Sequence, residues 1–294
     1  MSLPMIGIRT QAGEGIGLGH VRRCLALAHA LSGFGAQVRI VVDEDDRTVE
    51  LIQARGFHTV AVTSGDALAQ TYATFREWQV RAVIADSYEL DTQALETLRE
   101  VAGFLVVIDD LADRELPADI VTNSAIHAST LPYAGLPGTL YLLGPDFALL
   151  SREFTDTPKR MTRGQVEQVL ITIGGSDPSG LSDKLAEWTL DCFGTANINV
   201  VVGPFFSSAN VRAPAATRER SRLEIHHAPR EMHALMLKAD LAVTGGGQTT
   251  YELAATGTPA AAICIAENQR ANLRGLAEAG TLEFVGDASD ADLE

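Results

Sequence analysis

Short runs of apolar residues alternate with amphipathic stretches along almost the whole chain. The runs are rich in Val and Ile and lack strict alternation, as expected for strands that are buried on both faces. In the first half they predict strands at residues 5–8, 37–42, 59–62, 82–85, 104–108 and 120–122. Helical spacing predicts helices at 20–31, at 48–55 and between the strands at 59–62, 82–85 and 104–108. This order is typical of βαβ units and a parallel sheet.

The rhythm is interrupted between Ala125 and Arg163, a stretch that contains four prolines. It resumes with strands predicted at residues 168–173, 198–202, 223–226, 241–244 and 260–265, and helices at 181–192, 230–239, 249–256 and 268–279. We therefore expect two α/β domains, residues 1–150 and 160–294, joined by a Pro-rich crossing. Ligands of such folds bind at the carboxyl ends of the strands, here most naturally in the cleft between the domains.

Composition narrows the range of partners. Apolar residues make up 46% of the chain and charged residues 21%, a globular balance that excludes disorder as an overall description. The formal net charge of -15 disfavours binding of nucleic acid or of anionic lipid. An anionic ligand must therefore be held by local devices, such as helix N-termini and a few arginines.

Cysteine placement and hydropathy favour a cytoplasmic protein. Cys24, Cys192 and Cys264 are far apart and form no CxxC pair, which indicates reduced thiols. No apolar run approaches the roughly 18 residues of a membrane span, and no secretory leader is recognised.

We expect no metal site. HxxxH, HExxH and calcium-loop patterns do not occur, and the adjacent His226 and His227 of a strand point in opposite directions.

The first glycine-rich segment, residues 13–24, follows the first strand and opens a helix. Its glycines, among them Gly17 and Gly19, let a ligand approach the backbone closely, and the helix N-terminus favours negative charge. The spacing is neither a dinucleotide fingerprint nor a Walker motif. His20 lies in the first helical turn, where the neutral imidazole is favoured, which suits a general base. The alternative is a capping histidine in a purely structural turn.

Two further glycine segments follow strands in the second half. Gly174-Gly175-Ser176-Asp177 either turns backbone amides toward a ligand or makes a tight turn in which Ser176 or Asp177 caps the next helix. Residues 245–252 read GGGQTTYE and form a plausible diphosphate cradle at a helix start. Glu252 could meet ribose hydroxyls, or Thr249 and Glu252 could form a capping box that needs no ligand.

Carboxylates also follow two strands of the first half. Asp86-Ser87-Tyr88 ends one strand, and Asp109-Asp110 ends the next. Such aspartates can act as bases or bind metal, but more often they cap a helix or brace a loop. We favour bracing for Asp109 and Asp110.

Seven stretches of the chain, in order, resemble one enzyme family: the UDP-2,4-diacetamido-2,4,6-trideoxy-β-L-altropyranose hydrolases of pseudaminic acid biosynthesis, which are similar in fold to GT-B glycosyltransferases. The matching stretches are GIGLGHVRRCLALAHAL (15–31), ADSYELD (85–91), VIDDLADR (107–114), LLGPDFALLSREF (142–154), VLITIGGSDPSGLS (169–182), HHAPREMHALMLKADLAVTGGGQTTYE (226–252) and ENQRAN (267–272).

The resemblance implies two Rossmann-like domains of GT-B type, with the sugar on the first and UDP on the second. By position, His20 matches the catalytic histidine and Tyr88 a tyrosine beside the sugar. Glu252 matches the acid that holds the ribose. The other residues that we expect to bind substrate are Gly17, Gly19, Gly175, Ser176, Met232 (near uracil), Gly246, Gly247, Gln248 and Thr249 (diphosphate loop), Asn268 and Gln269 (near the sugar). The family binds diphosphate without metal or cofactor, and we expect a monomer.

Three departures from the family pattern bear on which sugar is bound. Gln11 stands where the family has Asp after the first strand, and Arg22 replaces a methionine. The phosphate loop has Gly247-Gln248 where the family has Ser-Thr/Ser. The expected activity is hydrolysis of a UDP-linked diacetamido-trideoxy sugar by water, with inversion at the anomeric carbon. Glycosyl transfer on the same fold and non-catalytic sugar-nucleotide binding are the alternatives.

Overall fold

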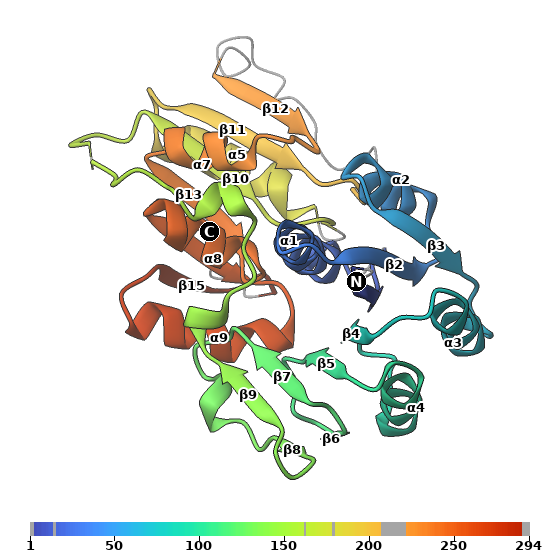
Figure 1. The fold of residues 1–294 in the computed structure, drawn as a ribbon. Coiled ribbons are helices and arrows are strands. Elements are labelled where there is room, and N and C mark those ends of the chain that lie inside the picture. The colour runs from blue at the N-terminus through green and yellow to red at the C-terminus, as the bar shows by residue number, and fades with distance from the viewer. Residues whose placement is uncertain (1–2, 14–15, 162, 178–179, 207–221, 290–294) are drawn as a thin grey trace. The chain divides into compact units, whose positions relative to one another are not determined.

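The computed structural model describes residues 3–13, 16–161, 163–177, 180–206 and 222–289 (Figure 1). The chain forms two compact units, of which unit 1 comprises Met1–Gly13 and His20–Ser151. Unit 2 comprises Glu14–Gly19 and Arg152–Glu294. Glu14, Gly15 and Pro178 of the predicted glycine segments lie outside the described residues. No helix of the described part of the chain is long and apolar enough to cross a membrane.

Unit 1 is built on a seven-stranded parallel sheet with the order β3-β2-β1-β4-β5-β7-β9. The strands are β1 (Met5–Thr10), β2 (Gln37–Asp43), β3 (His58–Val62), β4 (Ala82–Asp86), β5 (Leu105–Ile108), β7 (Ile120–Asn123) and β9 (Leu140–Leu143). The chain builds outward from β1 to β3 and then returns to the other side of β1 at β4. The carboxyl ends of β1 and β4 therefore form a topological switch point, the place where open α/β sheets bind ligands.

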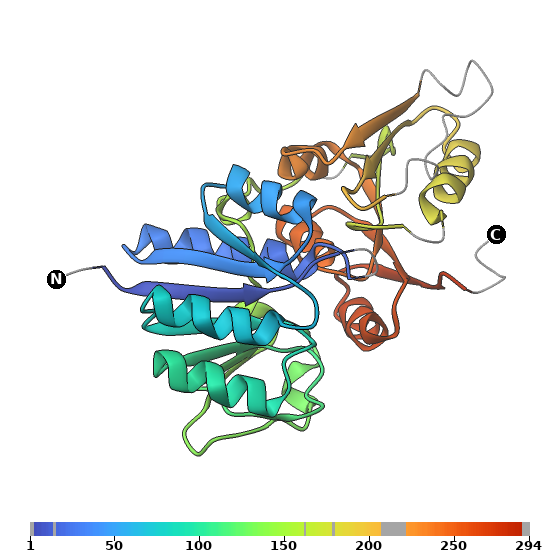
Figure 2. The ribbon, with the colours of Figure 1, turned by 90° about the vertical axis from the view of Figure 1, so that its right-hand side faces the viewer.

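Helices cover both faces of this sheet (Figure 2). They are α1 (Gly19–Gly33), α2 (Asp46–Ala54), α3 (Ala67–Glu77) and α4 (Thr92–Ala102). Local sequence sets their ends: the Asp91 side chain accepts a hydrogen bond from the Ala94 amide at 2.8 Å, and Gly103 closes α4 in the left-handed conformation. The remaining short elements are β6 (Glu115–Leu116), β8 (Ala134–Gly135), η1 (Ala128–Thr130) and η2 (Pro145–Phe147).

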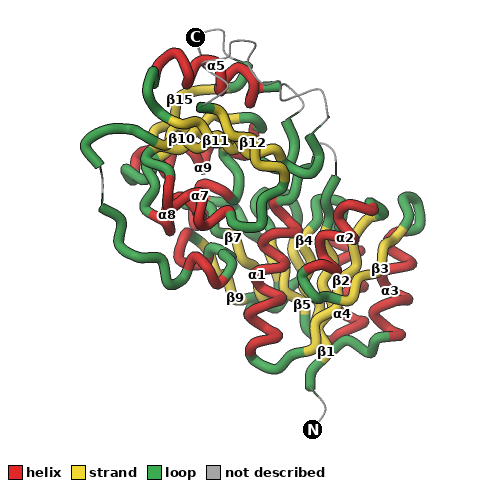
Figure 3. Tube along the Cα trace, turned by 90° about the horizontal axis from the view of Figure 1, so that it is seen from above, coloured by secondary structure: helices red, strands yellow, loops and turns green. Residues whose placement is uncertain are grey.

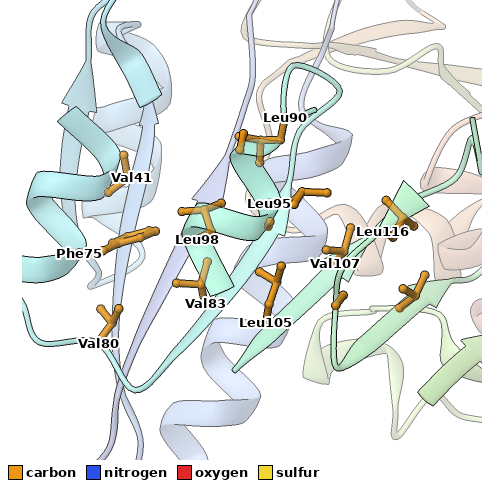
Figure 4. Close-up of a cluster of buried hydrophobic side chains, with 14 of the residues drawn as sticks. Val41, Phe75, Val80, Val83, Leu90, Leu95, Leu98, Leu105, Val107 and Leu116 are labelled. Carbon is orange, nitrogen blue, oxygen red and sulfur yellow. The ribbon is translucent and has the colours of Figure 1, made fainter. Parts of the chain in front are cut away.

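One hydrophobic core of unit 1 lies between the sheet and helices α3 and α4. Phe75 of α3 and Leu95 and Leu98 of α4 are fully buried against strand residues such as Val83 and Leu105 (Figure 4). Strand and helix residues of this kind bury most of their apolar surface, which is the main favourable term in folding. This packing fixes the directions of β4 and β5 and hence the position of the residues that follow them.

Unit 2 repeats the design with a six-stranded parallel sheet of order β12-β11-β10-β13-β14-β15. The strands are β10 (Gln168–Thr172), β11 (Asn197–Val202), β12 (Leu223–His227), β13 (Leu241–Gly245), β14 (Ala260–Cys264) and β15 (Glu283–Asp287). The helices are η3 (Arg152–Phe154), α5 (Leu181–Cys192), α7 (Met232–Lys238), α8 (Thr249–Thr256) and α9 (Glu267–Glu278). Helix α5 covers one face of the sheet, and α7, α8 and α9 lie on the other (Figure 3). The switch point here lies between β10 and β13.

The prediction of an α/β protein with parallel sheets is confirmed, and the predicted strands and helices are found with small shifts at their ends. Besides the two-residue strands β6 and β8, two strands of the main sheets were missed. β9 lies inside the Pro-rich stretch that we had interpreted as a break, and β15 adds a sixth strand to unit 2. Both are short edge strands, and neither has the Val- and Ile-rich pattern of a central strand. Gly286 further interrupts the apolar pattern of β15.

Candidate functional site

The switch point of unit 1 gathers a cluster of charged and titratable side chains. β1 pairs with β4 so that Thr10 lies opposite Asp86 at the carboxyl ends of the two strands. Helix α1 begins just beyond this edge, at Gly19. Its first turn therefore brings His20 and Arg23 to Asp86, and the loop after β5 brings Asp110. We call His20, Arg23, Asp86, Tyr88 and Asp110 the histidine cluster.

His20 is held by a buried carboxylate. Its Nδ1 atom lies 2.6 Å from Oδ1 of Asp86, and the two residues are 5% and 0% exposed. At this distance from an ionised acceptor, Nδ1 carries the proton, which leaves Nε2 as the unprotonated nitrogen. Nη2 of Arg23 also lies 3.0 Å from Nδ1, but a guanidinium only donates, so the proton on Nδ1 is given to Asp86. The arrangement is that of an oriented general base, with Asp86 as the group that orients it.

Arg23 neutralises Asp86. Its Nε and Nη2 atoms donate to the two carboxylate oxygens at 2.7 and 2.6 Å, a bidentate pair. The Cys24 thiol also donates to Asp86, at 3.4 Å. Burial by itself raises the pKa of Asp86, but Arg23 and His20 outweigh it and hold that pKa well below its ordinary value. Asp86 is thus an anion at neutral pH although it is fully buried.

Tyr88 closes the cluster on the side of His20. Its ring packs edge-on against the imidazole, with centroids 4.6 Å apart and an interplanar angle of 86°. Its hydroxyl donates to Oδ2 of Asp110 at 3.0 Å, and the same oxygen lies 3.4 Å from Nη1 of Arg23. Burial and the Asp110 charge raise the pKa of Tyr88, so the phenol keeps its proton at neutral pH.

The two residues that depart from the family pattern differ in their placement. Gln11 is buried at the end of β1, and its Oε1 accepts a hydrogen bond from the Ser87 hydroxyl at 2.6 Å. It therefore adjoins the histidine cluster through the neighbour of Asp86. Arg22 is half-buried on α1, next to Arg23 in sequence.

Asp109 and Asp110 have different roles. Asp109 braces its own loop as predicted: its carboxylate accepts hydrogen bonds from the Leu111 and Ala112 amides at 3.1 and 2.7 Å and pairs with Arg114. Bracing does not describe Asp110, because the partners found for its side chain lie outside its loop: Tyr88 follows β4, and Arg23 belongs to α1.

In unit 2, the loop after β13 is shaped by backbone rather than by charged side chains. A Cβ on Gly246 would lie 2.7 Å from Cδ1 of Leu273 and 2.8 Å from Cβ of Gln269, so helix α9 packs directly on this glycine. Gln269 also ties the loop down, because its Oε1 accepts hydrogen bonds from the Gly246 and Ile265 amides at 3.1 and 3.2 Å. Gly247 has open space where a Cβ would be.

Helix α8 begins directly after this loop without a capping box. The residue before the helix is Gln248, whose side chain makes no capping hydrogen bond, and Thr249 is the first helical residue. The alternative explanation for Thr249 and Glu252 is therefore wrong. Glu252 is 8% exposed, and Thr250 donates to the Gly247 carbonyl at 2.9 Å. The loop and the first turn of α8 form a rigid N-terminus of the kind that binds phosphate.

Three further residues considered in the sequence lie in the loop after β10. Asp177 caps α5, because its carboxylate accepts from the Leu181 and Ser182 amides at 2.9 and 2.8 Å, as the structural alternative predicted. Gly175 packs against the backbone of Leu18: a Cβ there would lie 2.9 Å from its amide nitrogen. Ser176 precedes this cap and is half-buried.

Four other predicted residues are spread over different elements. Met232 is the first residue of α7 and is buried, while Asn268 lies beside Gln269 at the start of α9. Gly17 has φ of +78°, which only glycine adopts easily, and Gly19 opens α1. Within unit 1 the structure thus brings His20 and Tyr88 together, and within unit 2 it joins Gly246 to Gln269.

The expected site residues did not include Arg23, Asp110 or Asp86, although Asp86 was considered as a carboxylate at a strand end. The usable signal was topological: carboxyl ends of adjacent parallel strands meet at one edge, and Arg23 is one helical turn after His20. No group of three or more His, Cys, Asp or Glu side chains suited to a metal ion occurs among the described residues.

Comparison with known proteins supports the resemblance drawn from the motifs, although no family model matches the chain. An uncharacterised protein of Methanocaldococcus jannaschii, MJ1062, is 28% identical over 277 residues, which cover 90% of this chain and 56% of that protein. The Helicobacter pylori pseudaminic acid cytidylyltransferase and UDP-2,4-diacetamido-2,4,6-trideoxy-β-L-altropyranose hydrolase is 26% identical over 86% of this chain and 43% of its own length. The Bacillus subtilis spore coat polysaccharide biosynthesis protein SpsG is 27% identical over 47% of this chain and 41% of its own length. The chain spans about half the length of these curated relatives.

Solved structures show the same fold. MurG of Acinetobacter baumannii has a TM-score of 0.64 at 16% identity, covering 97% of this chain and 86% of its own. LpCGTa, solved with UDP, has a TM-score of 0.61 at 12% identity, covering 96% and 84%. Anabaena HepE, solved with UDP and glucose, has a TM-score of 0.56 at 13% identity, covering 88% and 80%. The chain has the α/β fold of GT-B glycosyltransferases and is a distant homologue of a UDP-sugar hydrolase and of a polysaccharide biosynthesis protein.

Proposed function

We propose that this protein hydrolyses a UDP-linked 2,4-diacetamido-2,4,6-trideoxy sugar to UDP and the free sugar. The observation that carries the proposal is the His20–Asp86 pair, with Nδ1 held at 2.6 Å by a fully buried carboxylate. A base that is oriented in this way can take a proton from an attacking water. The 26% identity to the Helicobacter pylori hydrolase supports the choice of substrate class.

In the proposed reaction, the oxygen of a water molecule forms a bond to the anomeric carbon while the bond from that carbon to the diphosphate oxygen breaks. UDP leaves with the bonding electrons, and Nε2 of His20 takes the proton of the water. Asp86 stabilises the imidazolium that results. Attack opposite the leaving group inverts the anomeric configuration. UDP is a good leaving group, so the step requires no strong protein acid.

Unit 2 is the proposed site for UDP. The Gly246–Gly247 loop and the N-terminus of α8 offer backbone groups and a partial positive charge to the diphosphate, and this charge meets the negative charge that develops as UDP leaves. Glu252, buried one turn into α8, is assigned to the ribose hydroxyls. Gln248, Thr249, Met232, Asn268 and Gln269 remain the other candidate contacts, with Gly175 and Ser176 of the loop after β10. Tyr88, Gly17 and Gly19 are assigned to the sugar side.

Glycosyl transfer is the second candidate, because several of the similar solved structures are glycosyltransferases. The same base would then take the proton of an acceptor hydroxyl. The deciding experiment incubates the protein with UDP-sugars in water, without acceptor, and follows UDP release together with the anomeric configuration of the product by NMR. Stoichiometric UDP and inverted free sugar support hydrolysis. Binding without turnover, or a product that retains its configuration, would contradict the proposed mechanism.

His20→Asn tests the role of the base. Positioned general bases contribute about 10²–10⁴-fold, so kcat should fall by roughly that factor. UDP affinity should be nearly unchanged, because His20 is assigned to proton transfer and not to the nucleotide. The matched control is His29→Asn, on the same helix but exposed and packed against Phe57. Near-native kcat in His20→Asn would contradict the assignment.

A further inference from the structure

Asp110 is unlike an ordinary loop aspartate. One carboxylate oxygen, Oδ2, accepts the Tyr88 hydroxyl at 3.0 Å and faces Nη1 of Arg23 at 3.4 Å. The other, Oδ1, is buried and makes no hydrogen bond within the described residues. A buried carboxylate oxygen without a partner costs free energy, and such costs are tolerated mainly where function requires them. Asp110 contributes little to holding its own loop, which Asp109 already braces.

The charges of the histidine cluster do not cancel. Asp86 and Asp110 each carry one negative charge, and Arg23 carries one positive charge that contacts both. With His20 neutral, the cluster therefore has one negative charge in excess. Among the described residues, the groups found against His20 are Asp86 at the end of β4, Tyr88 just after it and Arg23 on α1. Asp110 reaches His20 through Tyr88 and Arg23. An excess of one negative charge is what a protonated His20 needs as its counter-charge.

Asp110 also sets the geometry of Tyr88. The phenol hydroxyl is anchored on Asp110 while the ring lies edge-on against His20, 4.6 Å between centroids. Without this hydrogen bond, the half-exposed Tyr88 ring is held less firmly against the imidazole. The same carboxylate thus acts on His20 by two routes, through Arg23 and through Tyr88.

We propose that Asp110 is a positioning residue for His20: it holds the Tyr88 ring against the imidazole and supplies the excess negative charge that stabilises His20 when it takes a proton. The charge effect can be measured in the resting protein without any substrate. The kinetic effect rests on the proposed function, in which His20 is the base.

The first experiment is an NMR titration of the His20 ring in the intact protein. Asp110→Asn removes the excess charge, so the pH at which the ring gains its proton should move down by about 1–2 units, the size expected for loss of one charge at roughly 6–12 Å and an effective dielectric constant near 20. Asp110→Glu keeps the charge and should move it less. Asp113→Asn is the matched control: this exposed residue lies in the same loop and pairs with Arg114, outside the cluster. Equal midpoints in Asp110→Asn and Asp113→Asn would overturn the charge role.

The second experiment separates the two routes by kinetics. Asp110→Asn should lower kcat about tenfold with little change in KM, and the acid limb of the pH profile should move to lower pH, because the base is protonated less readily. Tyr88→Phe removes the anchor but not the charge, so it should lower kcat without moving the acid limb. Unchanged kcat in Asp110→Asn, in a protein that does turn over a UDP-sugar, would overturn the proposal. If the wild type turns over no UDP-sugar, the hydrolase assignment fails, and the NMR titration still decides the charge role of Asp110.

Discussion

The two units carry candidate sites at equivalent places in similar sheets, but the two sites consist of different chemical groups. The site of unit 1 consists of ionised and titratable side chains: His20, Arg23, Asp86 and Asp110 hold one another at 2.6 to 3.4 Å. The site of unit 2 is mostly backbone, a loop whose Gly246 is pinned by α9 and by the Gln269 amide. The first arrangement suits proton transfer, and the second suits holding an anion.

This difference leads to different sensitivities. A buried charge network depends on every partner, because removal of one leaves another charge uncompensated. A glycine loop depends on the space around each Cα, so neighbouring glycines can differ completely in their tolerance of a side chain.

The largest effect is expected for Asp86→Asn. Loss of this charge leaves the buried Arg23 guanidinium without its bidentate partner, and breaking a buried pair in this way costs about 3–5 kcal/mol. Urea unfolding should show this loss in Asp86→Asn but not in Asp113→Asn, which removes an exposed charge. A loss below 1 kcal/mol would show that the cluster of unit 1 is not the coupled network described above.

The pH dependence of stability tests the same residue in the wild type. The folded pKa of Asp86 lies below its unfolded value, so the folded state binds this proton less readily. Its stabilisation is therefore complete above about pH 4, the ordinary Asp value, and is lost as the pH falls toward the folded pKa. The free energy of unfolding should fall less steeply below pH 4 in Asp86→Asn than in the wild type, and equal slopes would contradict the assignment.

A smaller, two-part effect is expected in the loop of unit 2. Gly246→Ala forces a Cβ to within 2.7 Å of Leu273, and overpacking of this kind costs about 1–3 kcal/mol of stability. Gly247→Ala meets no atom within 4 Å and should leave stability nearly unchanged. If the loop binds diphosphate, both variants should weaken UDP binding, measured by calorimetry. A Gly247→Ala protein that binds UDP like the wild type would place the diphosphate elsewhere.

The last prediction concerns UDP binding by Glu252→Ala. A charge-assisted hydrogen bond to ribose is worth about 1–3 kcal/mol, so UDP affinity should fall by that amount. Because α8 has no capping box at this position, loss of a cap should not accompany it. Affinity for UDP and for uracil can be compared in the same titration: if Glu252 binds ribose, only UDP binding should weaken.

Most of the fold could be predicted because short local stretches of sequence determine where its strands and helices lie. Val- and Ile-rich runs mark β1 and β10, and Asp91 and Gly103 bound α4, so strand and helix positions follow from neighbouring residues. The glycine loops were visible for the same reason. The edge strand β9 was not, because its pairing with β7 depends on a partner 20 residues away and its own four residues are only partly buried.

The charge cluster could be predicted only in part. His20 and Tyr88 stand in recognisable motifs, but the contacts of Asp86 join residues 63 and 66 positions apart, and Asp110 lies 87 positions from Arg23. No local pattern states which aspartate after a strand braces its loop and which turns to another element. That choice is set by strand order, which places the ends of β1, β4 and β5 along one edge.

The division of the chain has a consequence for dissecting the protein. The polypeptide passes between the units three times, after Gly13, after Gly19 and after Ser151, so unit 2 includes a short piece of the N-terminal region. Within that piece, Leu18 is 3% exposed and approaches the Gly175 backbone closely. A fragment that starts at Arg152 therefore lacks a packing partner, and its loop after β10 is left uncovered. Engineers who wish to exchange or express the halves separately should graft residues 14–19 onto the C-terminal fragment.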